Sequence, residues 1–212
     1  MPPWPSMPDP ADKLQRGQDG LPILSTREQE SLLSLARLAI RSHWHPALIY
    51  DLQQAQAELP LAQEPMACFV TLHKRGELRG CIGCLEPEKP LADALAYFAQ
   101  AAAFGDPRFV ALSEAELDEC ELSISLLGPL QPIPTQTRAQ LLQALIPQAD
   151  GLWLQSPGHR ATFLPAVWRE LPDPEEFLNH LLHKGGWPLT GWPQEMQGFR
   201  YHSLEIAEND IK

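Results

Sequence analysis

The chain has 212 residues, of which 44% are apolar, so it can bury a core as one domain or as a main domain with a subdomain. Its 16 basic and 27 acidic residues give a formal charge of −11, which disfavours non-specific binding to nucleic acid. No apolar run approaches the ~20 residues of a membrane span. The proline-rich start, Met1–Pro10, contains no basic residue and does not resemble a signal peptide. We therefore expect a cytoplasmic protein whose four cysteines are reduced, with no membrane or nucleic-acid partner.

The first part of the chain predicts a tail followed by helices. Residues 1–24 are rich in proline, glycine and charge, which predicts a disordered tail. Ser25 and Glu28 have the spacing of a capping box, and apolar residues at helical spacing then predict a helix to about Ser42. Residues 47–60 fit a second, weaker helix.

The middle of the chain predicts a hairpin and a helix. The apolar run Met66–Leu72 contains β-branched residues and predicts a buried strand. A turn at Lys74–Glu77 returns the chain antiparallel, so we expect the next segment to pair with that strand. Lys89-Pro90 opens a helix with one apolar face, and Gly105-Asp106-Pro107 ends it.

The remainder predicts further strands and helices. Clean alternation in Glu121–Leu127 indicates a half-buried strand, and Asp173-Pro174-Glu175-Glu176 indicates the start of a helix that runs to about Lys184. The other expected elements are a short helix at 138–146, strands at 152–154 and 161–164, a loop at 187–198 and a strand at Phe199–Ile206. Because strands and helices are mixed and several strand pairs are hairpins, we predict an α+β fold with antiparallel sheets flanked by helices.

The stretch Leu78–Gly83, which reads LRGCIG, is the most informative part of the chain. Glycines inside a strand weaken it, and they typically mark a place where something approaches the backbone closely. If the segment is extended, Arg79 and Cys81 share one face. A nearby cation lowers the pKa of a thiol, which favours Cys81 as a nucleophile or covalent-capture residue. The alternative is that Cys81 is a small apolar residue in a crowded strand.

Two further positions are candidates for anion binding. Asp106-Pro107-Arg108-Phe109 places an acid and a base around a proline turn; Arg108 could bind a carboxylate or phosphate, or it could pair with Asp106 and shape the loop. Lys184 could complement the dipole of its helix or project into a cleft.

Metal and redox sites are weaker alternatives. Cys81 and Cys84 have the spacing of a Cys-x-x-Cys motif, but the chain has no second ligand pair, and a hairpin strand is not the usual setting of a redox motif. His180 and His183 share a helix face, as two metal ligands would, but such a pair is more typical of a polar helix edge. We predict no metal site and no cofactor. The side of the sheet on which His73 lies depends on the register of the hairpin.

Several motifs carry a resemblance to a known family. They are LRGCIG at 78–83, DPRF at 106–109, LSISLL at 122–127, DG at 150–151, ATFLP at 161–165, VW at 167–168 and FL at 177–178 leading to Lys184. In this order they resemble the AMMECR domain family, whose prokaryotic members are called AmmeMemoRadiSam system protein A. We assign residues 25–208 to this domain and 209–212 to a tail. Cys84 departs from the family pattern, which usually has a small hydroxylated residue there, and Gly185 replaces an alanine.

The resemblance implies an α+β fold with a larger domain built from both chain ends and a smaller one inserted within it. It also implies partnership with a Memo-type protein and a radical S-adenosylmethionine protein. Because Cys84 departs from the family pattern, a mechanism that needs two thiols is disfavoured.

Two hypotheses for function follow. In the first, a cleft binds an anionic small molecule beside Cys81, and the cleft is lined by Arg79, Gly80, Gly83, Asp106, Arg108 and Lys184. In the second, the domain is a non-catalytic adaptor for protein partners, because no complete set of nucleophile, base and orienting residue is visible.

Overall fold

The computed structural model of the protein describes residues 15–59, 61–188, 190–193 and 195–210. In this part of the chain the elements are, in order, α1 (Thr26–Arg41), the 3-10 helix η1 (Pro46–Leu48), α2 (Ile49–Glu58), β1 (Cys68–Lys74), β2 (Glu77–Gly83), α3 (Leu91–Phe104), α4 (Glu114–Leu117), β3 (Cys120–Leu127), β4 (Gln131–Ile133), α5 (Arg138–Ala144), β5 (Gly151–Ser156), β6 (His159–Phe163), the 3-10 helix η2 (Pro165–Arg169), α6 (Pro174–Lys184), β7 (Gln197–Tyr201) and β8 (Ser203–Ala207).

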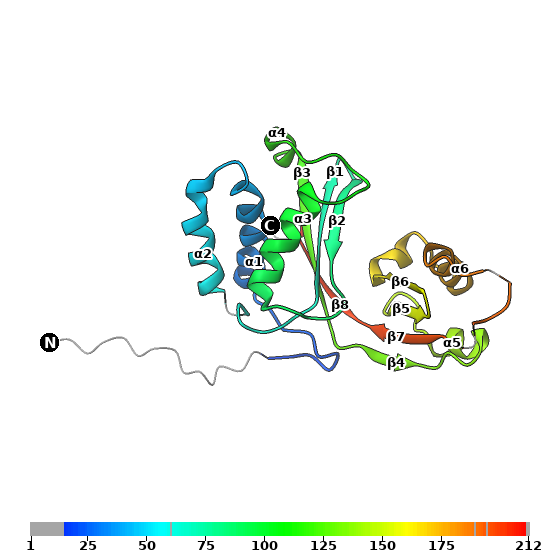
Figure 1. Ribbon diagram of the computed structural model, residues 1–212. Coiled ribbons are helices and arrows are strands. Elements are labelled where there is room, and N and C mark those ends of the chain that lie inside the picture. Colours follow the sequence, from blue (N-terminus) through cyan, green and yellow to red (C-terminus); the bar gives the residue numbers. More distant parts are fainter. Residues whose placement is uncertain (1–14, 60, 189, 194, 211–212) are drawn as a thin grey trace.

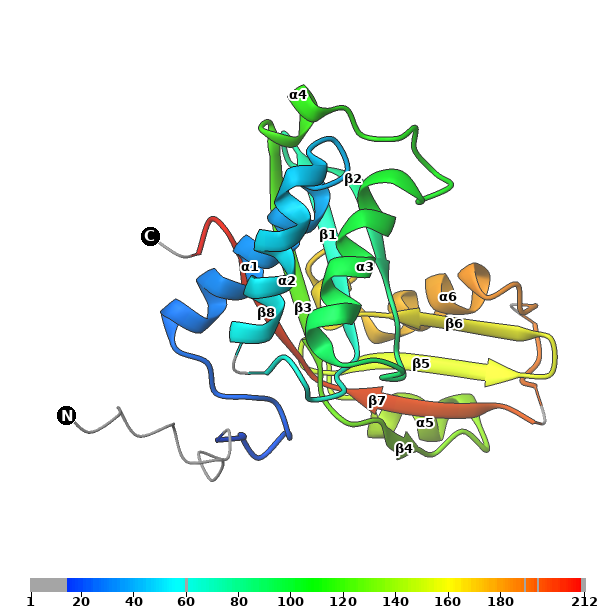
Figure 2. The same ribbon diagram turned by 60° about the vertical axis from the view of Figure 1, so that its left-hand side comes forward.

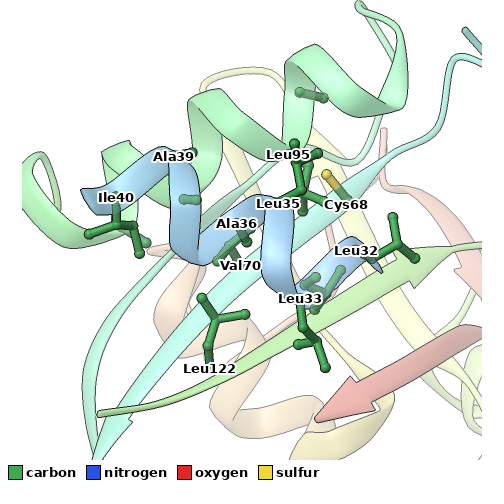
Figure 3. Packing of buried hydrophobic residues seen from close by; sticks show 14 of the residues in the cluster. Leu32, Leu33, Leu35, Ala36, Ala39, Ile40, Cys68, Val70, Leu95 and Leu122 are labelled. Atoms are coloured by element: carbon green, nitrogen blue, oxygen red, sulfur yellow. The ribbon is translucent and has the colours of Figure 1, made fainter. Parts of the chain in front are cut away.

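The first sheet has the strand order β2-β1-β3-β8, and every neighbouring pair is antiparallel. Helices α1 and α3 pack side by side over one of its faces, and Figure 3 shows Leu35 of α1 and Leu95 of α3 meeting beside Cys68 of β1. The capping box predicted at Ser25 and Glu28 is present at the start of α1. Within the described residues, the opposite face of this sheet is not covered by α1, α2, α3 or α4 (Figure 1). We call this sheet with α1, α2, α3 and α4 the large lobe.

The second sheet has the order β4-β7-β5-β6 and is also antiparallel throughout. One face packs against α5 and α6, where the rings of Trp168 and Phe177 stack 3.8 Å apart and Leu154 is fully buried. Asp173 caps α6 as predicted, with Pro174 in its first turn. We call this sheet with α5 and α6 the small lobe. The predicted α+β class with antiparallel sheets is confirmed.

The chain crosses between the lobes twice. It leaves the large lobe after β3 and returns through β8, so the large lobe contains segments from both sides of the inserted small lobe. The single strand expected at Phe199–Ile206 is wrong, because β7 and β8 belong to different sheets and His202 separates them (Figures 1 and 2). The expected loop at 187–198 is also too long, since β7 already begins at Gln197.

A small apolar cluster joins the two lobes. Ala67 and Leu127 of the large lobe pack with Trp153 and Tyr201 of the small lobe, and all four side chains are buried. Gly151 leaves room for the ring of Tyr201, since a Cβ there would lie 2.5 Å from it. The face of the small sheet that bears Trp153 is thus turned toward the helix-free side of the large sheet.

Part of the expected N-terminal tail packs onto the large lobe. Arg16 forms an ion pair with Glu64, Leu21 is buried, and the backbone N–H of Ile23 donates to the carbonyl of Gln15. The rest of that expected tail, residues 1–14, lies outside the described residues, as do residues 211–212 of the expected C-terminal tail. Among the helices that the structure describes, none is long and apolar enough to cross a membrane.

Candidate functional site

Cys81 lies on β2, an edge strand of the large sheet, on the face opposite the helices. Its neighbour Gly80 faces α3, and successive residues of a strand point to opposite faces. Thr71 of β1 stands directly across from Cys81, and its hydroxyl donates to the sulfur at 3.2 Å. The register also settles the position of His73, which alternates with Thr71 and therefore lies on the same face.

Arg79 does not share a face with Cys81, and the sequence expectation is wrong on this point. The pairing of β1 with β2 shifts between Leu72 and His73, which inserts Arg79 as an extra residue and breaks the alternation. The Arg79 guanidinium pairs with Glu116 at 3.1 Å and donates to the carbonyl of Val110 at 3.0 Å. Arg79 therefore ties β2 to the loop before α4 and is not positioned to bind a ligand at Cys81.

The two glycines of the motif provide space for the protein itself. A Cβ on Gly80 would lie 2.2 Å from the backbone oxygen of Ala102, so Gly80 lets α3 pack directly on β2. A Cβ on Gly83 would lie 2.2 Å from the carbonyl oxygen of Cys68 in β1. Gly80 is buried under α3 and does not line the cavity described below, whereas Gly83 does.

Asp106 and Arg108 bind the free edge of β2 at Cys81. The backbone N–H of Cys81 donates to Oδ2 of Asp106 at 2.9 Å, and Nη2 of Arg108 donates to the carbonyl of Cys81 at 3.3 Å. Arg108 also donates to both carboxylate oxygens of Asp106, at 2.9 and 2.6 Å. These bonds hold the pKa of the buried Asp106 carboxyl well below its usual range, with the Arg108 hydrogen bond as the largest cause. The structure is therefore compatible with both sequence alternatives for Arg108, pairing with Asp106 and binding an anion. The guanidinium pairs with Asp106, and its side chain stays half-exposed beside Cys81.

Lys184 brings a second cation from the other lobe. It is the last residue of α6, and its ammonium donates to the carbonyl of Thr162 at 3.0 Å and lies 5.1 Å from the ring centre of Phe163. The charges of Lys184, Arg108 and Cys81 are close enough to affect one another: the two cations favour the Cys81 thiolate, and Arg108 disfavours the ammonium of Lys184. Lys184 itself lines the cavity described below, together with Gly83 of the motif.

The balance of forces leaves Cys81 with a raised thiol pKa. Desolvation by burial is the largest cause, and it outweighs the opposing effects of the Thr71 hydrogen bond, Arg108 and Lys184. Of the two sequence alternatives for Cys81, this raised pKa agrees with the small buried residue and not with the low-pKa nucleophile. Desolvation also lowers the pKa of Lys184, which makes its amine easier to deprotonate. Burial thus favours the neutral form of both groups, the Cys81 thiol and the Lys184 amine.

A cavity of about 330 Å³ opens between the lobes; Lys184 lines it, whereas Cys81 and Arg108 lie outside its lining. Gly83, Cys84 and Phe69 line it from the large lobe, and Trp153, Thr162 and Lys184 line it from the small lobe. Sequence reasoning missed Thr71, Phe69, Trp153 and Arg160 as site residues. Only Thr71 had a signal, namely its place opposite the cysteine once the hairpin register is known. A larger cavity, about 730 Å³, lies at the β5–β6 turn and shares only Arg160 with the first.

The alternative metal and redox sites find no geometric support in the residues described. These contain no group of three or more histidine, cysteine or acidic side chains arranged to hold a metal ion. All four cysteines are free thiols, and Cys68 and Cys120 are buried. His180 and His183 lie at the exposed side of α6.

Comparisons with known proteins agree with this fold. The model of the AMMECR1 family matches residues 33–206. A protein from Methanothermobacter thermautotrophicus is 38% identical, with 78% of this chain and 85% of that protein covered. One from Aeropyrum pernix is 34% identical, with 88% and 81% covered. The crystal structure of the uncharacterized protein PH0010 from Pyrococcus horikoshii superposes with a TM-score of 0.72 at 26% identity, over 86% of this chain and 92% of that one. The family resemblance seen in the sequence is therefore confirmed, and the chain belongs to the AMMECR1 family.

Proposed function

We propose that the cleft between the lobes binds a small anionic molecule and presents it to the thiol of Cys81. The observation that carries this proposal is that both lobes bring a cation to the motif: Arg108 donates to the carbonyl of Cys81 at 3.3 Å, and Lys184 lines the cavity together with Gly83. In a chain of net charge −11, two cations directed at one cysteine form a local site for a negative group. Asp106 and the Cys81 carbonyl engage Nε and Nη2 of Arg108, so this guanidinium offers its Nη1 to a carboxylate or phosphate, and Lys184 provides a second point charge.

The raised pKa of Cys81 restricts how the thiol can react. Burial raises the pKa of the Cys81 thiol and so favours its protonated form, which means that attack requires a proton acceptor. Lys184 has a lowered pKa and is the candidate acceptor in its neutral form. When the bound anion carries an electrophilic carbonyl carbon, the thiol proton passes to the Lys184 amine and the sulfur–carbon bond forms. The electron pair of the carbonyl π bond then moves onto its oxygen, where Arg108 stabilises the charge.

Partnership with a Memo-type protein and a radical S-adenosylmethionine protein is part of the proposal and is supported by the family resemblance alone. A purely non-catalytic adaptor is the second candidate, and the protonated resting state of Cys81 favours it. Purified candidate partners, mixed with wild-type chain and with Cys81→Ser, discriminate the two. An adaptor binds them equally well in both forms, whereas a thiol-dependent reaction is lost with the sulfur.

Competing alkylation tests the anion site directly. Iodoacetate and iodoacetamide have the same leaving group, and only the former carries a negative charge. We expect the iodoacetate-to-iodoacetamide rate ratio at Cys81 to exceed that of the unfolded chain by about threefold or more, because Arg108 and Lys184 attract the anionic reagent. Mass spectrometry on a Cys84→Ser background assigns the label to Cys81, since residue 84 usually carries a small hydroxylated side chain in the family.

Two lysine variants complete this experiment. Lys184→Met should reduce the rate ratio toward the unfolded value. Lys89→Met is the matched control, because Lys89 also lies over an aromatic ring, that of Tyr97 at 4.4 Å, and does not line the cavity. A folded wild-type ratio equal to that of the unfolded chain would refute the anion site.

A further inference from the structure

The interlobe cavity has walls of opposite charge. Glu86 and Glu88 line it from the segment that follows β2 in the large lobe, and Arg160 and Lys184 line it from the small lobe. Glu88 lies close enough to Cys84 for its charge to raise the pKa of that thiol. This acid is therefore at the end of the cavity that the LRGCIG motif forms. The positive and negative walls are therefore contributed by different lobes.

These four charged side chains have no ion-pair partner among the residues that the structure describes. Within the described part of the chain, ion pairs engage neighbours such as Arg79 with Glu116 and Arg108 with Asp106, whereas Glu86, Glu88, Arg160 and Lys184 form none with one another or with other residues. The hydrogen bond that Lys184 makes is to the neutral carbonyl of Thr162, so no acid in the described part of the chain pairs with its amine. Because the acids on one wall do not pair with the bases on the other, a bound molecule with both charges could form ion pairs with both walls.

The cavity also has an apolar side. Phe69 of β1 and Trp153 of β5 line it where the lobes meet, and Trp153 packs against Phe199 at 5.4 Å between ring centres. A volume of about 330 Å³ is at the small end of ligand cavities, which suits a molecule of amino-acid size. Aromatic walls favour an apolar or aromatic body between the two charged ends.

We propose that the ligand of this cleft is a small zwitterion with an apolar body, such as an α-amino acid, whose carboxylate faces Lys184 and Arg160 and whose ammonium faces Glu86 and Glu88. This inference rests on the proposed anion site and adds a requirement for a positive group. The anion site alone would accept any small carboxylate, and the acidic wall makes the cleft discriminate among them.

Three probes of one shape separate these possibilities. L-phenylalanine has both charges, 3-phenylpropionate lacks the ammonium group, and phenethylamine lacks the carboxylate. Chemical-shift titration of the Trp153 indole N–H in ¹⁵N-labelled protein measures the affinity of each. We expect L-phenylalanine to bind about tenfold more tightly than either single-charge probe, because each wall adds a charge-assisted interaction.

Charge-neutral variants assign the preference to its residues. The double variant Glu86→Gln with Glu88→Gln should erase the advantage of L-phenylalanine over 3-phenylpropionate. Glu77→Gln, an exposed acid on β2 outside the cavity, should leave the advantage intact. Arg160→Gln should instead erase the advantage over phenethylamine.

The outcomes separate this inference from the function on which it rests. If 3-phenylpropionate binds as tightly as L-phenylalanine, the zwitterion inference is wrong and the anion site stands. If none of the three binds, the inference is overturned, while the alkylation ratio at Cys81 still judges the anion site independently. If phenethylamine binds best and the alkylation ratio is also unchanged, both are wrong.

Discussion

Asp106 accepts the backbone N–H of Cys81 at 2.9 Å, although the two residues are 25 positions apart. Because β2 is an edge strand, this N–H would otherwise point to solvent or to another strand. Asp106 and Arg108 thus take the place of a neighbouring strand at Cys81: Asp106 accepts its backbone N–H, and Arg108 donates to its backbone carbonyl. A single loop thereby closes the sheet edge and brings a cation to the thiol.

Replacing Asp106 with alanine should destabilise the fold by about 2–3 kcal/mol, because the Cys81 N–H and the Arg108 guanidinium both lose a charged acceptor. Urea unfolding of wild type and variant measures the change. Asp51→Ala, which alters an exposed acid of α2, should cost less than about 0.5 kcal/mol. Equal losses in the two variants would show that the contact to Cys81 contributes nothing specific.

Gly80→Ala should destabilise the protein by about 3 kcal/mol, because the new methyl group would lie 2.2 Å from the backbone oxygen of Ala102 and α3 would have to shift. Thermal unfolding measures this loss. Gly76→Ala provides the comparison: its turn has a φ of +82° but open space around the position, so it should cost only about 1 kcal/mol. A smaller loss at position 80 than at 76 contradicts the close packing of α3 on β2.

Thr71→Val should raise the pKa of Cys81 further, because the hydroxyl that donates to the sulfur stabilises the thiolate. Valine has nearly the same shape, so the strand pairing is retained. The pH dependence of iodoacetamide labelling at Cys81 reports this pKa. If the labelling curve stays in place or moves to lower pH, the Thr71 hydroxyl does not stabilise the thiolate and the prediction is wrong.

Glu116 should make stability depend on pH in the acid range. Arg79 and then Lys74 lower the pKa of Glu116 from 4.5 to about 2. Such a lowered pKa adds stability above the unfolded pKa, and this stability disappears as the pH falls through the folded value. Since Glu116 is partly solvent-exposed, we expect Glu116→Gln to cost about 1–2 kcal/mol at pH 6 and almost nothing near pH 2. Unfolding free energies at both pH values measure this difference, and an equal cost at both contradicts the pairing with Arg79.

Local signals in the sequence were sufficient for most elements of the fold. The capping residues Ser25 and Asp173 mark helix starts, and the alternation in Glu121–Leu127 marks a strand, because each depends only on neighbouring residues. The break at His202 carries no such signal, because the residues before and after it both have a strand pattern. They are two strands only because β7 joins the second sheet and β8 joins the first.

The candidate site was predictable only in part, because its geometry depends on contacts between segments that are far apart in the sequence. The motif pointed to Cys81 and Arg108, but an inserted residue in β2 reversed the side of Arg79, and alternation cannot reveal such a bulge. The approach of Lys184 depends on how the lobes pack through Trp153 and Tyr201, which no local pattern encodes.

The central claim is that Cys81 of the large lobe and Lys184 of the small lobe form one electrostatically coupled site. The most direct measurement is the pKa of Cys81, from the pH dependence of iodoacetamide labelling in the Cys84→Ser protein with and without Lys184→Met. We predict a pKa above that of a free cysteine in the first protein, because of burial, and a higher one when the ammonium is removed. A pKa that is unchanged or lower in the Lys184→Met variant would contradict the account.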